Sequence, residues 1–206
     1  MTQPTLNRRA ILGSLAGLSG LSLLWPVKAW AQVCSPTSSD ILGPFYTPDA
    51  PHRALLAGPD EPGDPLVVHG RVLGPDCRVP LRRALLDVWQ ADANGQYHYQ
   101  KDNFRLRGQL LTDDTGSFGF TTVVPGRYKL EGSYRPAHIH VIVSHPRHQP
   151  LTTQLYFKGD PYLGAKDACG DECNSNDPDR IADLKKSEVG RGFAADVRII
   201  LGAQTG

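Results

Sequence analysis

Residues 135–143 read Arg-Pro-Ala-His-Ile-His-Val-Ile-Val, the most informative stretch of this sequence. Ile139 and residues 141–143 are β-branched, as is typical of a strand. Successive side chains of a strand point to opposite faces, so His138 and His140 share one face and Ile139 takes the other. Two neutral imidazoles on one face form half of a transition-metal site. The stretch therefore predicts a strand that carries two metal ligands.

Short apolar runs separated by turn residues lie on both sides of this strand. They predict strands at 65–73, 85–89, 108–112, 117–123, 127–130, 137–143, 152–157 and 192–201. Glycine (21) and proline (17) are abundant, which favours short strands joined by turns over long helices. We therefore expect a mainly β protein, an antiparallel β-sandwich of about seven or eight core strands. The polar segment 159–189 is expected to be a loop with one helical turn near 179–186.

The N-terminal region has the pattern of an export signal. Arg8 and Arg9 open a positively charged segment, residues 10–25 are apolar, and residues 29–31 read Ala-Trp-Ala, a small-X-small cleavage pattern. The paired arginines predict the twin-arginine route, and an ordinary secretory signal is the alternative. We expect a cleavable segment at 1–31, an exported protein and no stable membrane anchor. Residues 32–206 then form one catalytic domain, which begins with an irregular, Pro-rich arm over 32–64.

Charge and cysteine content limit the possible partners. Basic residues (22) nearly balance acidic residues (21), so the charge gives no reason to expect nucleic acid or an anionic membrane as a partner. Four cysteines, Cys34, Cys77, Cys169 and Cys173, are expected to form disulfides in an oxidising compartment. Three pairings are open. A thiolate metal site at Cys169 and Cys173 is the rival interpretation.

Several motifs occur in a characteristic order around the His pair. Residues 87–97 read Asp-Val-Trp-Gln-Ala-Asp-Ala-Asn-Gly-Gln-Tyr, residues 125–128 read Pro-Gly-Arg-Tyr, and residues 154–157 read Gln-Leu-Tyr-Phe. With residues 111–116 and 135–140, this set resembles the intradiol ring-cleavage dioxygenases, non-haem iron(III) enzymes that open catechols. The resemblance runs from about Gly43 to the end of the chain. It implies a mixed β-sandwich core with the metal in a cleft near one edge.

The resemblance implies four ligands to Fe(III): Tyr97, Tyr128, His138 and His140. The chemistry of these side chains agrees, because a ferric ion favours anionic oxygen and a bound cation of that charge strips the proton from a phenol. Two phenolates and a hydroxide would neutralise the ion, and two imidazoles would complete five-coordination. Tyr99, two residues after Tyr97, is the fallback ligand.

The resemblance also implies a reaction and further site residues. A catechol-type diol and O2 would give a cis,cis-muconate-type dicarboxylate, with Tyr128 leaving the metal to accept a substrate proton. Arg135 would stabilise a carbanionic ring, and its alternative role is a structural ion pair. Gln154 would line the oxygen side of the pocket, and its alternative is an ordinary strand glutamine. Tyr46 and Arg53 in the arm are candidates for bordering the substrate.

The chain departs from the family in one respect and leaves two other functions open. The long helical N-terminal region of the catechol and chlorocatechol members is absent, and with it their usual helical dimer interface, so a homo- or hetero-oligomer stays open. One alternative function is a secreted β-sandwich binding module with a vestigial site. Another is a zinc or copper hydrolase, which needs a third His or a carboxylate near the His pair; Asp113 and Asp114 are the nearest candidates.

Overall fold

The computed structural model describes residues 34–204 except 101, 188 and 189, so the predicted signal segment at 1–31 lies outside the described residues. The elements in chain order are β1 (Pro65–Leu73), β2 (Leu85–Gln90), β3 (Arg107–Leu111), β4 (Ser117–Val123), β5 (Lys129–Leu130), β6 (Ser133–Tyr134), β7 (His138–Ser144), β8 (Leu151–Phe157), η1 (Gly164–Lys166), η2 (Gly170–Cys173), η3 (Pro178–Arg180), β9 (Ile181–Ala182), β10 (Lys185–Lys186) and β11 (Phe193–Ile200). Among these residues, no helix has the length and apolar character needed to cross a bilayer.

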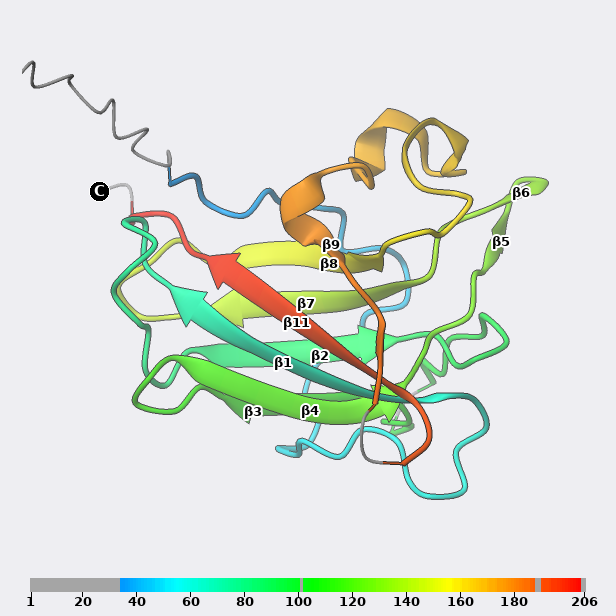
Figure 1. The fold of residues 1–206 in the computed structure, drawn as a ribbon, viewed down its shortest axis with the longest axis horizontal. Helices are drawn as coiled ribbons and strands as arrows, with labels where there is room; N and C mark the ends of the chain where they lie inside the picture. Colours follow the sequence, from blue (N-terminus) through cyan, green and yellow to red (C-terminus); the bar gives the residue numbers. More distant parts are fainter. Residues whose placement is uncertain (1–33, 101, 188–189, 205–206) are drawn as a thin grey trace, which may run out of the picture. The chain divides into compact units, whose positions relative to one another are not determined.

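Two sheets form the predicted β-sandwich. One has the strand order β10-β11-β1-β4 and the other β3-β2-β7-β8-β9, with β5 and β6 paired separately. In Figure 1 the sheet with β1 and β11 lies in front of the sheet with β2 and β7. Side chains from both sheets, such as Val68 and Phe120 from the first and Val141 and Leu155 from the second, share one apolar core. Burial of this apolar surface is what holds the two layers together.

Both sheets contain parallel as well as antiparallel pairs. The strand pattern predicted an antiparallel sandwich, whereas the family resemblance implied a mixed one. β1 pairs with β11 in parallel, and β8 pairs with β9 in parallel. Parallel neighbours need a long crossover connection, which the many residues between β1 and β11 provide. The second correction concerns the helical turn expected at 179–186. Only η3, which begins at Pro178, is helical there, and the residues after it pair with sheet edges as β9 and β10.

β7 lies in the middle of its sheet and is buried on both faces. Ile139, Val141 and Val143 point into the sandwich core, and His138 and His140 point to the other face. The strand register fixes the neighbours of His140 on that face: Trp89 of β2 and Gln154 of β8 lie directly opposite it. We call this surface of the five-stranded sheet the polar face.

The arm, residues 34–64, covers the polar face. It begins along β8, where Asp40 N donates to Thr152 O at 2.9 Å. It then reaches β3, where Arg53 N donates to Gln109 O at 2.9 Å, and continues along β4, where Leu56 N donates to Thr121 O at 2.8 Å. The arm therefore crosses the sheet from one side to the other and buries the His pair beneath it.

All four cysteines form disulfides. Cys34 pairs with Cys77, and Cys169 pairs with Cys173. The first bond joins the start of the described arm to the turn after β1, and the second closes the η2 turn. The rival interpretation of Cys169 and Cys173 as thiolate metal ligands is wrong in this structure.

Candidate metal centre

Three of the four predicted ligands meet at one point. The Tyr97 hydroxyl lies 3.0 Å from His138 Nε2 and 3.1 Å from His140 Nε2, and the two nitrogens are 3.2 Å apart. The three side chains are at least nine-tenths buried. We call these three atoms the donor triangle. They come from two elements, because the histidines lie on β7 and Tyr97 follows the turn after β2.

The tautomer of His138 is fixed by its backbone partner. Its Nδ1 lies 2.6 Å from the Pro136 carbonyl oxygen. A carbonyl only accepts hydrogen bonds, so Nδ1 carries the proton and Nε2 presents a lone pair to the donor triangle. A backbone carbonyl on the remote nitrogen is the usual way in which proteins orient a metal-binding histidine.

His140 is oriented by stacking instead. Its ring lies 4.6 Å from the Trp89 ring, with the two planes 8° apart, and its Nδ1 has no hydrogen-bond partner among the described residues. Gly43 of the arm lies on the edge of the same ring, where a Cβ would be 3.4 Å from His140 Cε1. The imidazole is thus held by an aromatic ring and by close backbone packing.

A tight turn places Tyr97 beside Tyr128. Asp92 Oδ1 accepts from the backbone N–H groups of Asn94 and Gln96, and Gly95 has a φ of +80°. A Cβ on Gly95 would lie 2.2 Å from the Arg127 carbonyl oxygen, so only glycine lets these two segments of the chain approach each other this closely. The approach brings the Tyr97 and Tyr128 rings edge to face, with centroids 5.6 Å apart.

Tyr128 lies next to the donor triangle without joining its short contacts. Its ring is half-buried and lies 5.9 Å from the His138 ring. The Phe45 ring of the arm contacts both tyrosines, stacked on Tyr97 at 4.4 Å and edge-on to Tyr128 at 5.8 Å. The predicted fourth ligand is therefore adjacent to the other three and is the most exposed of the set.

Burial sets the protonation states of the triangle. Burial, followed by the positive charge of Arg135, lowers the pKa of His138 to about 3. Burial, and then the neighbouring His138, also hold the pKa of His140 well below its ordinary value. Burial raises the pKa of the Tyr97 phenol. Without a cation the site therefore contains two neutral imidazoles and a neutral phenol.

The donor triangle fits a small transition-metal ion. A metal bonded to nitrogen at about 2.1 Å separates two adjacent ligand atoms by about 3.0 Å when they subtend a right angle, which matches the three observed spacings. The donors are two imidazole nitrogens and one phenol oxygen, and the phenol would ionise beside a highly charged cation. Among the described residues no cluster of three or more His, Cys, Asp or Glu side chains exists. The tyrosine oxygen is thus an essential part of this candidate site.

Arg135 is buried beside the triangle and paired with a carboxylate. Its Nε and Nη2 donate to the two oxygens of Asp167 at 2.9 and 3.1 Å, and Nη2 also donates to Tyr156 Oη at 3.0 Å. Burial opposes the charge, but the hydrogen bond to Asp167, the charge of that carboxylate and the neighbouring phenols together outweigh burial and raise the pKa of Arg135. The ion pair weighed as the alternative role of Arg135 is present, and the guanidinium nevertheless lies close enough to influence His138.

Gln154 lies on the polar face and is bonded at both ends. Its Nε2 donates to the Ile41 carbonyl at 2.9 Å, and its Oε1 lies 2.9 Å from Tyr156 Oη. The side chain is fully buried. Gln154 thus connects the arm to the sheet directly opposite His140.

The other candidates do not belong to the donor triangle. Tyr99 is half-exposed and packs on Phe45, so the fallback is not supported. Tyr46 donates to Asp87 at 3.0 Å, and burial, followed by the Asp87 charge, raises the pKa of Tyr46 to about 12. Arg53 donates to the carbonyls of Phe104 and Arg107.

The third ligand that a hydrolase would need is missing from the described residues around the His pair. Asp113 accepts hydrogen bonds from Thr115 and Ser117 within its own turn, and Asp114 is exposed and pairs with Arg82. Both carboxylates lie on the turn between β3 and β4. The zinc or copper hydrolase interpretation predicted a carboxylate beside the His pair, and neither Asp113 nor Asp114 lies there.

A separate hollow of about 820 Å³ lies at the C-terminal end of β8. Among its lining residues are Arg127, Phe157, Asp160 and Tyr162, and none of the four predicted ligands lines it. A large hollow is the usual first guess for a ligand site. Here the buried donors carry the chemistry, so the donor triangle is the better candidate.

Sequence reasoning missed several residues that build the site. Tyr156 could have been found, because strand alternation places it on the same face as Gln154 and opposite His138. Asp167 could not, because it lies in a polar loop without periodicity. Asp40, which lies 2.7 Å from Tyr156 Oη, is also in an irregular segment.

Comparisons with known proteins agree with this picture. A family model described as Dioxygenase matches residues 41–199. A catechol 1,2-dioxygenase from Acinetobacter lwoffii is 40% identical over 157 residues, covering 66% of this chain and 56% of that protein. An intradiol ring-cleavage dioxygenase of Aspergillus niger is 35% identical over 150 residues, covering 63% and 48%. The chain thus spans about half the length of these curated relatives.

Solved structures of dioxygenases are similar to most of this chain. The dioxygenase domain of a dioxygenase carbohydrate-binding protein fusion from Streptomyces sp. SirexAA-E is 37% identical with a TM-score of 0.70, covering 82% of this chain and 100% of that one. The 3-chlorocatechol 1,2-dioxygenase of Rhodococcus opacus 1CP has a TM-score of 0.74 at 31% identity, covering 82% and 73%. With a family model that matches most of its length, this chain belongs to the intradiol ring-cleavage dioxygenase family.

Proposed function

We propose that this protein is an iron(III)-dependent intradiol dioxygenase. Its substrates would be a catechol-type diol and O2, and its product a cis,cis-muconate-type dicarboxylate formed by cleavage between the two hydroxyl-bearing carbons. The observation that carries the proposal is the donor triangle of Tyr97, His138 and His140, with Tyr128 beside it. Relatives named as catechol and hydroxyquinol 1,2-dioxygenases support the substrate class.

Four residues would hold the ion: Tyr97, Tyr128, His138 and His140. When bound there, a ferric ion would supply Lewis acidity that favours the ionised diol and withdraws electron density from its ring. The buried triangle keeps both imidazoles neutral, so their lone pairs are available as ligands. His138 is preset for this role by its bond to the Pro136 carbonyl.

Tyr128 is the residue suited to accept a proton from the diol. Tyr97 is buried in the triangle, whereas Tyr128 is half-buried at its edge and has more freedom to move. A phenolate at Tyr128 Oη would take the proton of an entering hydroxyl, which is general-base chemistry. The positive charge of Arg135, fixed by Asp167, would favour negative charge on the substrate ring.

The arm would keep bulk water away from the reacting groups. Phe45 covers the face of Tyr97, and Gly43 packs on His140. Excluding water strengthens the electrostatic effect of nearby charges and prevents side reactions. The same segment therefore shapes the entrance that a diol must use.

Colour and oxygen consumption test the proposal. Purified protein loaded with iron should be red-brown from tyrosinate-to-iron charge transfer, and it should consume O2 with at least one member of a catechol panel. With ¹⁸O2, both labelled atoms should enter the open-chain diacid. A colourless iron-treated protein that takes up no O2 would favour the binding-module alternative. A yellow semialdehyde would show cleavage outside the hydroxyl-bearing carbons and refute the intradiol assignment.

We also propose that the protein is exported through the twin-arginine route with cleavage after Ala31. The presence of all four cysteines in disulfides supports an oxidising destination. That route carries folded proteins, which suits a metal acquired before export. Cell fractionation of the chain and of an Arg8→Lys/Arg9→Lys variant tests this proposal, because the variant should stay in the cytoplasm. Export of the variant at an unchanged level would point to an ordinary secretory signal.

A further inference from the structure

A buried ion pair lies beside the donor triangle. Arg135 and Asp167 meet through two hydrogen bonds, and their side chains are 1% and 0% exposed. A guanidinium held by both oxygens of a carboxylate is fixed in position and in plane. Removing one partner of a buried pair leaves an uncompensated charge, so the other partner must move or draw in water.

The pair is connected to the polar face through Tyr156. Arg135 Nη2 donates to Tyr156 Oη, which also lies 2.7 Å from Asp40 Oδ2. The Tyr156 ring is 5.9 Å from the His138 ring. A shift of the guanidinium would therefore be transmitted to the residues that surround the metal ligands.

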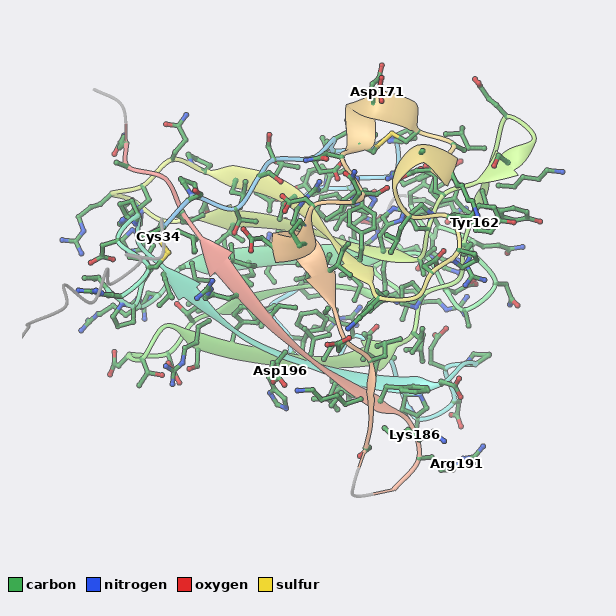
Figure 2. The ribbon with its side chains drawn as sticks, turned by 45° about the horizontal axis from the view of Figure 1, so that its top comes forward. Cys34, Tyr162, Asp171, Lys186, Arg191 and Asp196 are labelled. Carbon is green, nitrogen blue, oxygen red and sulfur yellow. A yellow bond between two sulfur atoms is a disulfide. The ribbon has the colours of Figure 1, made fainter. Side chains whose placement is uncertain are left out.

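Asp167 lies on a short loop that a disulfide restrains. It occupies the connection between η1 and η2, and its Oδ1 also accepts from Cys169 N at 2.9 Å. The Cys169–Cys173 bond closes the η2 turn. Figure 2 shows Asp171, in the same turn, pointing away from the strands. The loop is thus a surface turn that delivers a single carboxylate inward.

We propose that Asp167 is a positioning residue that holds Arg135 in place beside the metal centre, and that the Cys169–Cys173 disulfide keeps Asp167 in position. The proposal rests on the proposed function and adds to it a residue outside the ligand set. Asp167 is not a catalytic residue, because its carboxylate is saturated by Arg135 and by the Cys169 amide. Its effect passes through the guanidinium.

The first test is Asp167→Asn, which keeps the shape of the side chain and removes its charge. We expect kcat to fall by about tenfold with a change in KM below about twofold, since a misplaced guanidinium affects the transition state more than ground-state binding. Iron content and the visible band should be retained. Loss of the iron would instead make Asp167 a structural support of the metal centre and overturn the positioning role.

A double-mutant cycle shows whether Asp167 acts through Arg135. The variants are Arg135→Gln, Asp167→Asn and the two combined. If the effect passes through the guanidinium, adding Asp167→Asn to Arg135→Gln should leave kcat within about twofold of Arg135→Gln alone. Independent, multiplicative losses would contradict the proposal. The combined variant also replaces a buried charge pair with two amides, which guards against failure to fold.

The disulfide is tested with Cys169→Ser/Cys173→Ser, and Cys34→Ser/Cys77→Ser is the matched control. The first variant should reproduce the kcat loss of Asp167→Asn at least in part. The control should keep kcat, because the arm stays attached to β11 through Thr37 N and Ile200 O. Equal kcat values for the wild type and the first variant would remove the disulfide from the proposal.

A readout without turnover separates this proposal from the proposed function. The Arg135 side-chain Nε–H signal in ¹⁵N spectra of the metal-free protein should exchange with solvent about tenfold faster in Asp167→Asn and in Cys169→Ser/Cys173→Ser than in the wild type. If no catechol is cleaved but these exchange rates change, the positioning role stands and the reaction is wrong. If catechol is cleaved and neither exchange nor kcat changes, the positioning role is wrong.

Discussion

The Phe45 ring lies flat on the Tyr97 ring, with centroids 4.4 Å apart and planes 15° from parallel. Phe45 belongs to the irregular arm, and Tyr97 belongs to the buried donor triangle. The pair therefore joins the segment that covers the polar face to the oxygen that would bind the metal. Stacked aromatic pairs add about 1 kcal/mol beyond the area they bury, so this contact also helps to hold the arm closed.

Replacing Phe45 with alanine should open this cover. We expect the free energy of unfolding to fall by about 2 kcal/mol, below the range for a fully buried phenylalanine because Phe45 is only half-buried. The visible band of the iron-loaded protein should shift as water reaches Tyr97. Urea titration and absorption spectra measure the two effects, and Phe45→Leu is the volume-conserving control. A band that is identical in Phe45→Ala and the wild type would separate Phe45 from the metal centre.

His138→Ala should abolish iron retention. The substitution removes one corner of the donor triangle, and the described residues offer no nearby carboxylate or cysteine as a replacement ligand. Metal analysis after gel filtration measures bound iron. His145→Ala, on the connection between β7 and β8, is the control and should bind iron like the wild type. Full iron content in His138→Ala would remove the His pair from the site.

Tyr128→Phe should weaken or shift the visible band and slow turnover by about 10²-fold or more, the usual contribution of a general base. The ring stays in place, so its contacts with Phe45 and Tyr97 are kept. Absorption spectra and oxygen uptake measure the change. Tyr134→Phe, an exposed residue of β6, is the control. An unchanged spectrum would take Tyr128 out of the ligand set.

Gly43→Ala should disturb the His140 ring from the arm side. Gly43 has a φ of +72°, and a Cβ there would lie 3.4 Å from His140 Cε1. We expect a loss of about 1 kcal/mol in the free energy of unfolding from the left-handed backbone, together with weaker iron binding because any backbone shift that relieves this strain moves the new Cβ against the His140 ring. Gly132→Ala is the matched control, because Gly132 has a φ of +91° and no neighbour within 4 Å. If both variants bind iron equally well, the contact with His140 has no role.

Breaking the Cys34–Cys77 bond should destabilise the protein more than breaking the Cys169–Cys173 bond. Their sequence separations are 43 and 4 residues. Loop-closure entropy then gives about 4 kcal/mol for the first bond and about 2 kcal/mol for the second. Urea titrations of the two double-serine variants measure this difference. A larger loss for the Cys169→Ser/Cys173→Ser variant would show that the η2 turn carries more of the fold than its length implies.

Local patterns in the sequence were sufficient to predict most strands and the shared face of the two histidines. β-branched runs bounded by Gly and Pro gave most strands to within one or two residues, and alternation put His138 and His140 on one face. The parallel pairing of β1 with β11 was not predictable in this way, because it joins segments more than a hundred residues apart. Such pairings depend on the whole topology and not on local propensity.

The metal centre was predictable only where its residues lie on regular elements or in recognised motifs. Tyr97, His138 and His140 meet as the resemblance implied. Asp167 and Phe45 lie in segments without periodicity, so nothing local indicates which way their side chains point. Burial and hydrogen bonding in the folded chain decide their roles.

The way the arm crosses the sheet implies an order of assembly. The strands β2, β7 and β8 must pair before the arm has a surface on which to dock, and docking then closes the space above His140. In the folded protein an ion would reach the donor triangle on the side where Tyr128 is only half-buried, which a diol would also use. The Cys34–Cys77 bond fixes the start of the arm and so limits how far this cover can open.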